Sequence, residues 1–274
     1  MPELPEVETV RRTLEPAICG QCIRGVQVFW EKTLVPWPET PYADVLNNAF
    51  IQSIGRRGKY LLINLEPNWT LLAHLRMTGQ FVYYPEPRAA DTHTRVIFAL
   101  TRGELHFHDT RKFGRIQLLP TDQTTVCPSL AKLGPEPFSP EFTRQYLQHA
   151  LAKCKNGKLK PLLLSQAIVV GLGNIYVDEA LFRAKIRPER IAAQLDEAEA
   201  RALHAAIIDV LTAGIEHCGT TFRDFRTANG EKGGFQDMLQ VYGRAGEACR
   251  CCGRTLEKLR LGGRTSVYCA HCQR

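Results

Sequence analysis

The sequence lacks a long apolar run, an apolar leader and any repeated or low-complexity tract. No window comes near the roughly 18 uninterrupted apolar residues of a membrane-spanning helix, so we expect none. The chain opens with MPELPEVETV, in which acidic residues stand where a signal peptide is apolar, so we expect a cytoplasmic protein. Hydrophobic residues make up 44% of the chain and charged residues 23%, values that exclude a disordered or fibrous protein.

Acidic residues are the minority among the charges, with 28 Asp and Glu against 35 Lys and Arg, a net charge of +7. This surplus favours phosphate-rich partners but does not distinguish nucleic acids, nucleotides and acidic lipids. After residue 243 only Glu247 and Glu257 are acidic, whereas seven residues are Lys or Arg. The C-terminal segment is therefore either a solvated basic face or a surface that contacts a polyanion.

Four of the 10 cysteines form a pattern. Cys249 and Cys252 are a C-x2-C pair, and Cys269 and Cys272 are a second pair after 16 intervening residues. Two such turns joined by a hairpin-length spacer supply the four thiolates of a tetrahedral zinc site. Four thiolates leave no open coordination position, so this Zn2+ would be structural and would not activate water. Disulfides are the weaker alternative in the cytoplasmic protein that we expect.

Other thiols do not fit this pattern. Cys251 and His271 lie inside the two turns, but either of them as a ligand would break the two-residue spacing. Cys19 and Cys22 form another C-x2-C that has no partner pair, so we expect small buried or idle thiols there.

Turn residues divide the first half of the chain into short apolar stretches, a spacing that is typical of an antiparallel sandwich or barrel. Before them, Val7, Val10 and Leu14 recur at helical spacing, and we expect Pro16 and Gly20 to close this helix. Beyond residue 140 the pattern predicts helices. The expected strands cover residues 22–30, 50–54, 60–65, 70–75, 81–84, 95–100, 104–108 and 115–119, and the expected helices cover 140–151, 159–170, 174–184, 195–217 and 221–226.

A Pro-rich joint at Leu133–Pro140 separates these two halves, and the cysteine-rich hairpin begins near residue 235. The expected fold class is therefore α+β. We expect an N-terminal antiparallel β-sandwich flanked by helices at residues 1–134, a helical domain at 135–234 and a four-cysteine zinc-finger β-hairpin at 235–274.

The first residues combine an unusual nucleophile with two carboxylates. Removal of Met1 would leave Pro2 with a free secondary amine, part of which is neutral at pH 7 because α-amino groups have a pKa of about 8. Such an amine can attack an electrophilic sugar carbon and form a covalent imine. Glu3 lies beside it, and Glu6 is one helical turn further on. Proline and acidic residues at a helix N-terminus are also explained by helix stability alone.

Two further segments couple a cation to an apolar side chain beside a glycine. They are HLRMTG, which contains Met77, and DTRKFG, which contains Arg111 and Phe113. An apolar wedge can enter a base step while an arginine pairs with a base edge, so the pattern suits DNA. A sheet rim with ordinary turns would also explain it. Lys59 opens an apolar strand, where it either snorkels or projects into a cleft.

The segment Val169–Glu179 places Gly171 and Gly173 directly before an apolar helix that opens at Asn174. Backbone N–H groups at the positive end of a helix form a seat for a phosphate. The segment is not a dinucleotide-binding fingerprint, because the third glycine would fall at Tyr176 and no strand precedes it.

Taken in order along the chain, three of these motifs carry a resemblance. The opening PELPEVET, the Gly-Leu-Gly-Asn helix pair and the terminal four-cysteine finger resemble those of the formamidopyrimidine-DNA glycosylase family, and the similarity runs essentially end to end. It implies a helix–two-turn–helix motif and a bifunctional enzyme of base excision repair. Such an enzyme removes 8-oxoguanine and formamidopyrimidines from duplex DNA and leaves a one-nucleotide gap through AP lyase β,δ-elimination. The implied partner is damaged double-stranded DNA, bound by a monomer, and the implied cofactor is one structural Zn2+.

The resemblance implies catalytic roles for five residues. Pro2 resembles the nucleophile that forms a Schiff base at C1′ of the damaged nucleotide. Glu3 is similar to the acid/base partner in base release and ring opening, and Glu6 to a supporting carboxylate. Lys59 matches a cation that contacts the DNA backbone and donates a proton in β-elimination. Arg264 matches the finger arginine that is linked to δ-elimination.

The resemblance also implies DNA contacts. Met77, Arg111 and Phe113 resemble the trio that fills the gap left by the flipped base, with Arg111 facing the orphaned cytosine. The segment Gly219–Gln236 resembles the mobile loop that closes over the extruded base. Thr220 and Thr221 belong to this loop, and the expected DNA-backbone contacts are His74, His93, Asn156, Lys160, Asn174 and Tyr242.

Three positions depart from the pattern expected of the family. Asn156 stands where many relatives carry Lys or Arg, which puts its phosphate contact in doubt, although Lys155 or Lys158 could substitute. Ser165 stands where an acidic residue is usual, and Arg95 occupies the place of a second histidine after His93.

Two rival functions remain from the sequence. The sister branch of glycosylases that removes oxidised pyrimidines shares the Pro2-Glu3 chemistry, but its members usually carry Gly where this chain has Leu4. A catalytically idle DNA-binding regulator with a zinc finger is the other rival. The intact set of Pro2, Glu3 and Lys59 argues against it.

Overall fold

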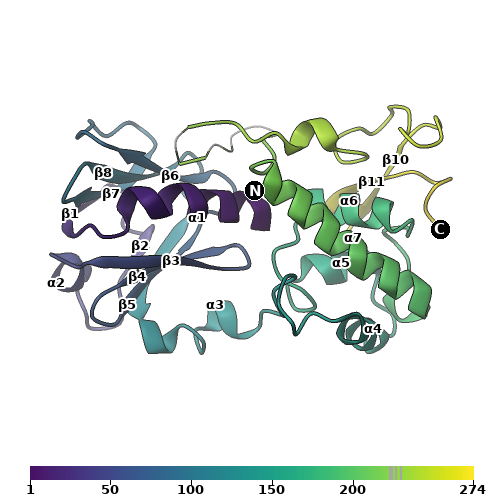
Figure 1. Ribbon diagram of the computed structural model, residues 1–274, viewed down its shortest axis with the longest axis horizontal. Helices are drawn as coiled ribbons and strands as arrows, with labels where there is room; N and C mark the ends of the chain where they lie inside the picture. Colours follow the sequence, from purple (N-terminus) through teal and green to yellow (C-terminus); the bar gives the residue numbers. More distant parts are fainter. Residues whose placement is uncertain (222–224, 226, 229) are drawn as a thin grey trace. The chain divides into compact units, whose positions relative to one another are not determined.

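The computed structural model describes residues 1–221, 225, 227–228 and 230–274, which fall into two compact units (Figure 1). Unit 1 comprises Met1–Ala131 and His217–Gly234, and unit 2 comprises Lys132–Glu216 and Phe235–Arg274. The division differs from three consecutive domains, because the segment 217–234 belongs to unit 1 and the cysteine-rich hairpin belongs to unit 2.

The described part of unit 1 is built on two sheets, with strand orders β1-β7-β8-β6 and β2-β9-β5-β4-β3. Neighbouring strands are antiparallel except for the parallel pair β2–β9. Every strand expected from the sequence is present, whereas β2, only two residues long, was not expected. The strands are β1 (Ile23–Val28), β2 (Leu34–Val35), β3 (Ile51–Arg57), β4 (Tyr60–Leu65), β5 (Trp69–His74), β6 (Gly79–Tyr84), β7 (Thr94–Leu100), β8 (Glu104–Asp109) and β9 (Arg115–Pro120).

Helix α1 (Leu4–Ile18) lies between the two sheets (Figure 1). Its buried apolar face, which includes Val7, Val10 and Leu14, joins the same hydrophobic core as strands of both sheets. The helix does not end at Pro16 as expected. Pro16 lies inside the last turn, and the helix stops at Ile18, before Gly20 takes a left-handed φ of 81°.

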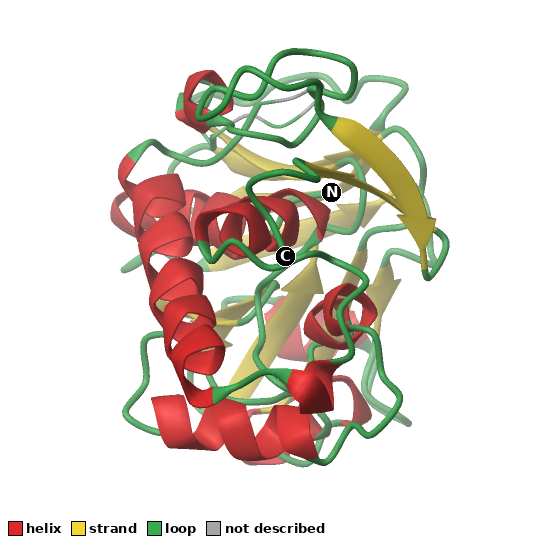
Figure 2. Ribbon diagram, turned by 90° about the vertical axis from the view of Figure 1, so that its right-hand side faces the viewer, coloured by secondary structure: helices red, strands yellow, loops and turns green. Residues whose placement is uncertain are grey.

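Unit 2 is mainly helical, and Figure 2 shows its helices in red and its hairpin in yellow. The helix expected at 159–170 ends at Leu164, because Gln166 adopts a φ of 65° and its side chain organises the turn that follows. The Gln166 amide donates to Leu172 O (2.7 Å) and its oxygen accepts from Gly171 N (2.9 Å). The elements are α4 (Arg144–Ala152), α5 (Leu159–Leu164), α6 (Asn174–Arg183), η2 (Ala192–Gln194), α7 (Glu197–Glu216), η3 (Phe235–Met238), β10 (Glu257–Leu261) and β11 (Arg264–Tyr268).

One expected helix, at 221–226, falls mostly outside the described residues. Several short helices were not expected from the sequence. The unexpected elements of unit 1 are α2 (Tyr42–Leu46), η1 (Thr121–Gln123) and α3 (Pro128–Ala131).

The hydrophobic cores explain why each unit contains two separate segments of the chain. Phe225 and Ala228 join the core that α1 shares with the sheets, which places their segment in unit 1. Phe182 of α6 packs in a second cluster with Val241, Val267 and residues of the cysteine finger, which places the finger in unit 2. None of the helices in the described part of the chain combines the length and apolar character that crossing a membrane requires.

Candidate active site

The N-terminus of α1 carries two buried carboxylates that the sequence singled out. Glu3 is 3% exposed and Glu6 is 1% exposed, and Pro2 beside them is also buried. Glu6 Oε2 accepts a hydrogen bond from Glu3 N (2.7 Å), and Glu6 Oε1 accepts one from Thr220 N (2.7 Å). One carboxylate therefore holds both the start of the helix and a segment more than 200 residues later in the chain.

The segment after Gly219 is anchored at its base. Gly219 has a φ of 77°, and a Cβ there would lie 2.9 Å from the Glu6 carboxylate, so glycine is required. Thr221 Oγ1 donates to Phe225 O (3.0 Å) and accepts from Gly233 N (2.9 Å). Thr220 and Thr221 thus lie at the anchored start of this segment.

Lys59 lies in the tight turn between β3 and β4 and is 6% exposed. Arg56 ties this turn to α1, because its Nε donates to Glu8 Oε2 (3.1 Å) and its Nη1 donates to Gly58 O (3.1 Å). Burial raises the pKa of Glu8, but its hydrogen bonds to Arg56 and to two arginines of α1 outweigh burial and hold the pKa at about 2.

His74, at the end of β5, is neutral at physiological pH. It is 8% exposed, and burial together with the positive charges of Arg76 and Lys59 lowers its pKa to about 3. Its Nδ1 accepts from Arg76 N (3.0 Å), so the neutral ring carries its proton on Nε2. His74 can therefore donate one hydrogen bond to a phosphate but contributes no charge to it.

The structure brings Arg111 and Phe113 together. Arg111 Cζ lies 5.1 Å from the centre of the Phe113 ring, and Phe113 is 50% exposed. Met77 is half-buried in the β5–β6 loop, and the next residue, Thr78, accepts a hydrogen bond from Arg111 N at 3.3 Å. An exposed aromatic ring beside a cation is what a wedge into stacked bases needs.

The burial of Lys160 contradicts the direct phosphate contact that we expected for it. The side chain is 0% exposed, and its Nζ donates to Asp178 Oδ1 (2.7 Å) and to Thr265 O (2.9 Å). Burial raises the pKa of Asp178 to about 7, although Lys160 and the N–H of Val267 both lower it. Lys160 therefore fastens α5 and α6 to the β10–β11 hairpin and offers no surface to a ligand.

Two further predicted residues lie at this hairpin, the DNA contact Asn174 and the catalytic residue Arg264. Asn174, at the start of α6, donates from Nδ2 to Thr265 O (3.2 Å) and is only partly buried. Arg264 is exposed at the first position of β11, directly after Gly262 and Gly263, which have φ values of 53° and 75°. Two consecutive left-handed residues form the tight turn that fits a two-residue hairpin, and this turn presents Arg264.

Glu179 is a residue that the sequence reasoning missed. It is 3% exposed and accepts hydrogen bonds from three consecutive backbone N–H groups, those of Gln240 (2.9 Å), Val241 (2.9 Å) and Tyr242 (2.8 Å). Burial raises its pKa, while these N–H groups lower it. A carboxylate on the buried face of α6 was the available signal, and its effect is to fix the segment that carries Tyr242.

The remaining phosphate candidates lie at the surface. Asn156 is exposed in the turn before α5, and its neighbours Lys155 and Lys158 are exposed as well. His93 is exposed in the loop before β7, and its backbone N–H donates to Asp91 Oδ1 (2.7 Å).

The structure explains the two other departures from the family pattern. Arg95 is 7% exposed and donates to the backbone oxygens of Asp109 (2.8 Å) and Thr92 (3.1 Å), so it supports two loops from within. Ser165 Oγ donates to Leu162 O (2.6 Å) and so helps to end α5.

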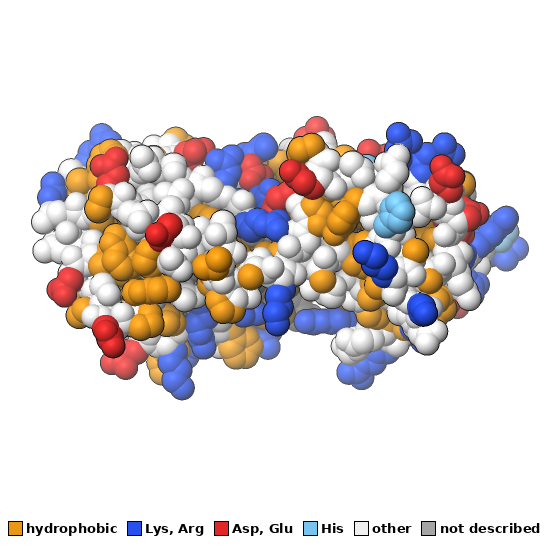
Figure 3. All heavy atoms as spheres, turned by 90° about the horizontal axis from the view of Figure 1, so that it is seen from below, with side chains coloured by type: hydrophobic (Ala, Val, Ile, Leu, Met, Phe, Trp, Pro, Cys, Tyr) orange, Lys and Arg blue, Asp and Glu red, His pale blue; other side chains and the backbone are white. Residues whose placement is uncertain are grey.

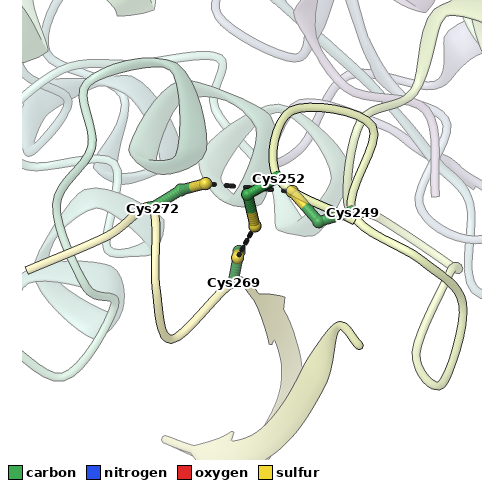
Figure 4. A group of neighbouring side chains, drawn as sticks. All are labelled: Cys249, Cys252, Cys269 and Cys272. Atoms are coloured by element: carbon green, nitrogen blue, oxygen red, sulfur yellow. Dashed lines mark hydrogen bonds between the residues drawn. The ribbon is translucent and has the colours of Figure 1, made fainter. Parts of the chain in front are cut away.

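The four patterned cysteines converge in the finger (Figure 4). Their sulfur atoms lie within 4.8 Å of one another, with Cys249–Cys272 at 3.9 Å and Cys252–Cys269 at 3.5 Å. A zinc tetrahedron with Zn–S bonds of about 2.3 Å has sulfur–sulfur edges of about 3.8 Å, so the cluster fits Zn2+. Cys251, between the first pair, is exposed and is not part of the cluster.

Side chains that contribute to the net charge of +7 lie at the surface. Figure 3 shows many Lys and Arg side chains at the surface, among scattered Asp and Glu. The net positive charge, rather than a single basic patch, favours a polyanionic partner.

Replacing the buried lysine, Lys160→Met, should lower the free energy of unfolding by about 3–5 kcal/mol, because it leaves the Asp178 carboxylate buried without its cation. Denaturant unfolding of the whole chain measures this loss. The double variant with Asp178→Asn should recover part of it, since the uncompensated charge is then gone.

The matched control is Asp209→Asn, which removes an exposed ion pair of the same unit. Arg183 and Asp209 lie 3.0 Å apart with side chains 57% and 49% exposed. This change should cost less than about 1 kcal/mol. Equal losses from the two single variants would contradict the role assigned to Lys160.

Family models match three stretches that together cover most of the chain. Residues 1–116 match the formamidopyrimidine-DNA glycosylase N-terminal domain, and residues 133–226 match the H2TH domain of the same family. Residues 246–274 match a zinc finger found in FPG and IleRS.

The chain is also similar to individual proteins. The formamidopyrimidine-DNA glycosylase of Desulfitobacterium hafniense (strain DSM 10664 / DCB-2) is 49% identical over 273 residues, with 100% of both chains covered. Wild-type Lactococcus lactis Fpg (MutM), solved with DNA containing N7-benzyl-Fapy-dG, has a TM-score of 0.93 and 39% identity over 100% of both chains. The Lactococcus lactis Fpg solved with DNA containing an abasic site has a TM-score of 0.92 and 39% identity over 99% of both chains.

Proposed function

The chain belongs to the formamidopyrimidine-DNA glycosylase family, and from this premise we propose that it excises oxidised purines from duplex DNA and then cleaves the abasic site. The substrates are 8-oxoguanine and formamidopyrimidines. The chemistry runs through a Schiff base at Pro2, and the enzyme acts as a cytoplasmic monomer on damaged double-stranded DNA.

The N-terminal constellation is the observation that carries this proposal. Pro2 is buried directly before two buried carboxylates, and Glu6 positions Glu3 and Thr220 through hydrogen bonds of 2.7 Å each. Once Met1 is removed, the Pro2 nitrogen is a secondary amine with a usable lone pair. Relatives of similar fold have been solved with Fapy-dG-type and abasic DNA, which supports the same substrate class for this chain.

The glycosylase step begins when the damaged nucleotide rotates out of the duplex, which costs about a few kcal/mol. The Pro2 nitrogen bonds to C1′ while the bond from C1′ to the base breaks and its electron pair leaves with the base. Glu3 donates the proton that opens the sugar ring at O4′, which yields the iminium form of the Schiff base.

The lyase step follows from the positive charge on that imine. The charge makes the C2′ proton acidic, so its removal expels the 3′ phosphate, and a second elimination expels the 5′ phosphate. Lys59 and Arg264 serve these β- and δ-eliminations. Zn2+ held by Cys249, Cys252, Cys269 and Cys272 would have no open coordination position, so it would supply no chemistry and would hold the hairpin that presents Arg264.

The DNA contacts follow from exposure and charge. Phe113, Arg111 and Met77 fill the gap that the extruded base leaves, with Arg111 facing the opposite cytosine. Neutral His74 donates to a phosphate through Nε2. The other backbone contacts are His93, Asn156, Asn174 and Tyr242, while Lys160 acts only through the hairpin that it supports.

Borohydride trapping tests the proposed function. Incubation of the protein with an 8-oxoguanine·cytosine duplex and borohydride should yield a covalent protein–DNA adduct, because reduction fixes the imine. A duplex with thymine glycol should give much less. Preferential trapping of thymine glycol would assign the chain to pyrimidine lesions, and no adduct with either duplex would identify a DNA-binding protein without catalysis.

A further inference from the structure

Asp109, the last residue of β8, connects three loops from a completely buried position. The residue is 0% exposed, and its Oδ1 accepts from Thr78 Oγ1 (2.5 Å) and from Arg111 N (3.1 Å). Its Oδ2 accepts from Gly114 N (2.6 Å), and its backbone N–H donates to His93 O (2.9 Å). One carboxylate therefore grips the loop after Met77 and both ends of the Arg111–Gly114 segment.

The core beneath these loops also joins them, because both loops pack on the same side chain. A Cβ added to Gly79 would lie 2.8 Å from the Phe107 ring, and one added to Gly114 would lie 2.5 Å from it. Phe107 is 0% exposed, so this ring is fixed in the core and both glycines rest on it. The β5–β6 and β8–β9 loops are thus seated on one side chain and joined by one carboxylate.

The backbone of both loops is held in a costly conformation. Arg76 has a φ of 56° and Lys112 a φ of 59°, the left-handed region that non-glycine residues seldom occupy. Each immediately precedes an expected wedge residue, Met77 or Phe113. Such backbone persists only where surrounding contacts determine it, and the hydrogen bonds to Asp109 supply contacts of that kind.

We propose that Asp109 is a positioning residue that, with Thr78, locks Met77, Arg111 and Phe113 into one rigid wedge. The inference rests on the proposed function, in which these three side chains replace the extruded base. Rigidity matters because a loose wedge must be ordered at each encounter, which subtracts from the energy available for eversion. It matters most for Arg111, whose backbone N–H is bonded directly to Asp109, because its guanidinium must meet one particular base edge.

Thr78→Val tests the lock, because valine has the shape of threonine but cannot donate to Asp109. We expect single-turnover excision of 8-oxoguanine opposite cytosine to fall about tenfold, the equivalent of one charge-assisted hydrogen bond. The preference for cytosine over adenine opposite the lesion should shrink as well. Borohydride trapping on a preformed abasic duplex should stay within about twofold, since that substrate has no base to extrude.

Three further variants separate positioning from general stability. Thr78→Ser keeps the hydroxyl and should restore both excision and opposite-base preference. Asp109→Asn should lose at least as much as Thr78→Val, because an amide cannot accept hydrogen bonds through both of its ends. Thr70→Val is the matched control, since Thr70 is a fully buried hydroxyl of the same unit bonded to Asn64 (3.0 Å) and Thr121 (2.9 Å).

The outcomes distinguish this inference from the proposed function. An unchanged opposite-base preference in Thr78→Val and Asp109→Asn overturns the positioning role. Equal losses in Thr78→Val and Thr70→Val, in excision and abasic trapping alike, also overturn it, because they reduce it to stability. Failure of the unmodified chain to be trapped on abasic DNA overturns the proposed function itself, and the inference with it.

Discussion

A chain that carries extra residues before Pro2 should give no borohydride-trapped adduct with damaged duplex DNA, a loss of at least about 100-fold. In such a chain the proline nitrogen is part of a planar amide, whose lone pair is delocalised and cannot attack C1′. DNA affinity should stay within a few-fold, because the residues proposed as the wedge and as phosphate contacts are unchanged. The measurements are gel-resolved trapping and a binding titration on the same duplex.

The control uses a cleavable extension. Proteolytic removal that leaves Pro2 as the first residue should restore trapping in the same preparation. Mass spectrometry of the reduced adduct should then place the sugar on the Pro2 nitrogen. Undiminished trapping before cleavage, or a sugar on the Lys59 side chain, would show that another amine is the nucleophile.

The second large effect is expected from Cys269→Ser, which removes a fully buried zinc ligand. Zinc binding contributes an apparent 10–16 kcal/mol in zinc-finger peptides, about the whole stability of a small domain, so the finger should lose its fold. Zinc content should fall from one ion to nearly none. DNA affinity should fall at least about tenfold, because Arg264 and the hairpin that carries it are no longer held in place.

Cys251→Ser is the matched control, since Cys251 lies between two ligands but is exposed and outside the cluster. It should keep one zinc ion and unchanged affinity. Elemental analysis and a DNA titration on both variants make the comparison. If Cys269→Ser retained zinc and bound DNA normally, the four-cysteine site would not support the interface.

Local patterns predicted much of this molecule. The strands followed from apolar stretches between turns, since alternation along a strand such as β4 is visible in neighbouring residues. The zinc ligands followed from spacing alone. The N-terminal carboxylates are adjacent in the sequence, so their proximity required no knowledge of the fold.

The sequence did not reveal which polar side chains are buried by contacts with distant parts of the chain. Lys160 looked like a surface cation, and only its 2.7 Å contact with Asp178 on another helix shows that it is internal. Glu179 and Asp109 are likewise ordinary acidic residues in the sequence. Glu179 matters because it accepts hydrogen bonds from backbone N–H groups far along the chain, and Asp109 because it joins the distant Thr78 hydroxyl to two nearby backbone N–H groups. The shortened α5 reflects a turn built by the Gln166 side chain, which helical periodicity cannot represent.

The hydrogen bond from Thr220 to Glu6 has a consequence for synthesis on the ribosome. The two residues are 214 positions apart, and Phe225 and Ala228 complete the core around α1. A nascent chain that has emerged only as far as α7 therefore lacks the backbone N–H that binds Glu6 and the side chains that complete the core around α1. The hydrogen bond at Glu6 and the core around α1 are therefore completed only late in synthesis, after the whole of α7 has been made.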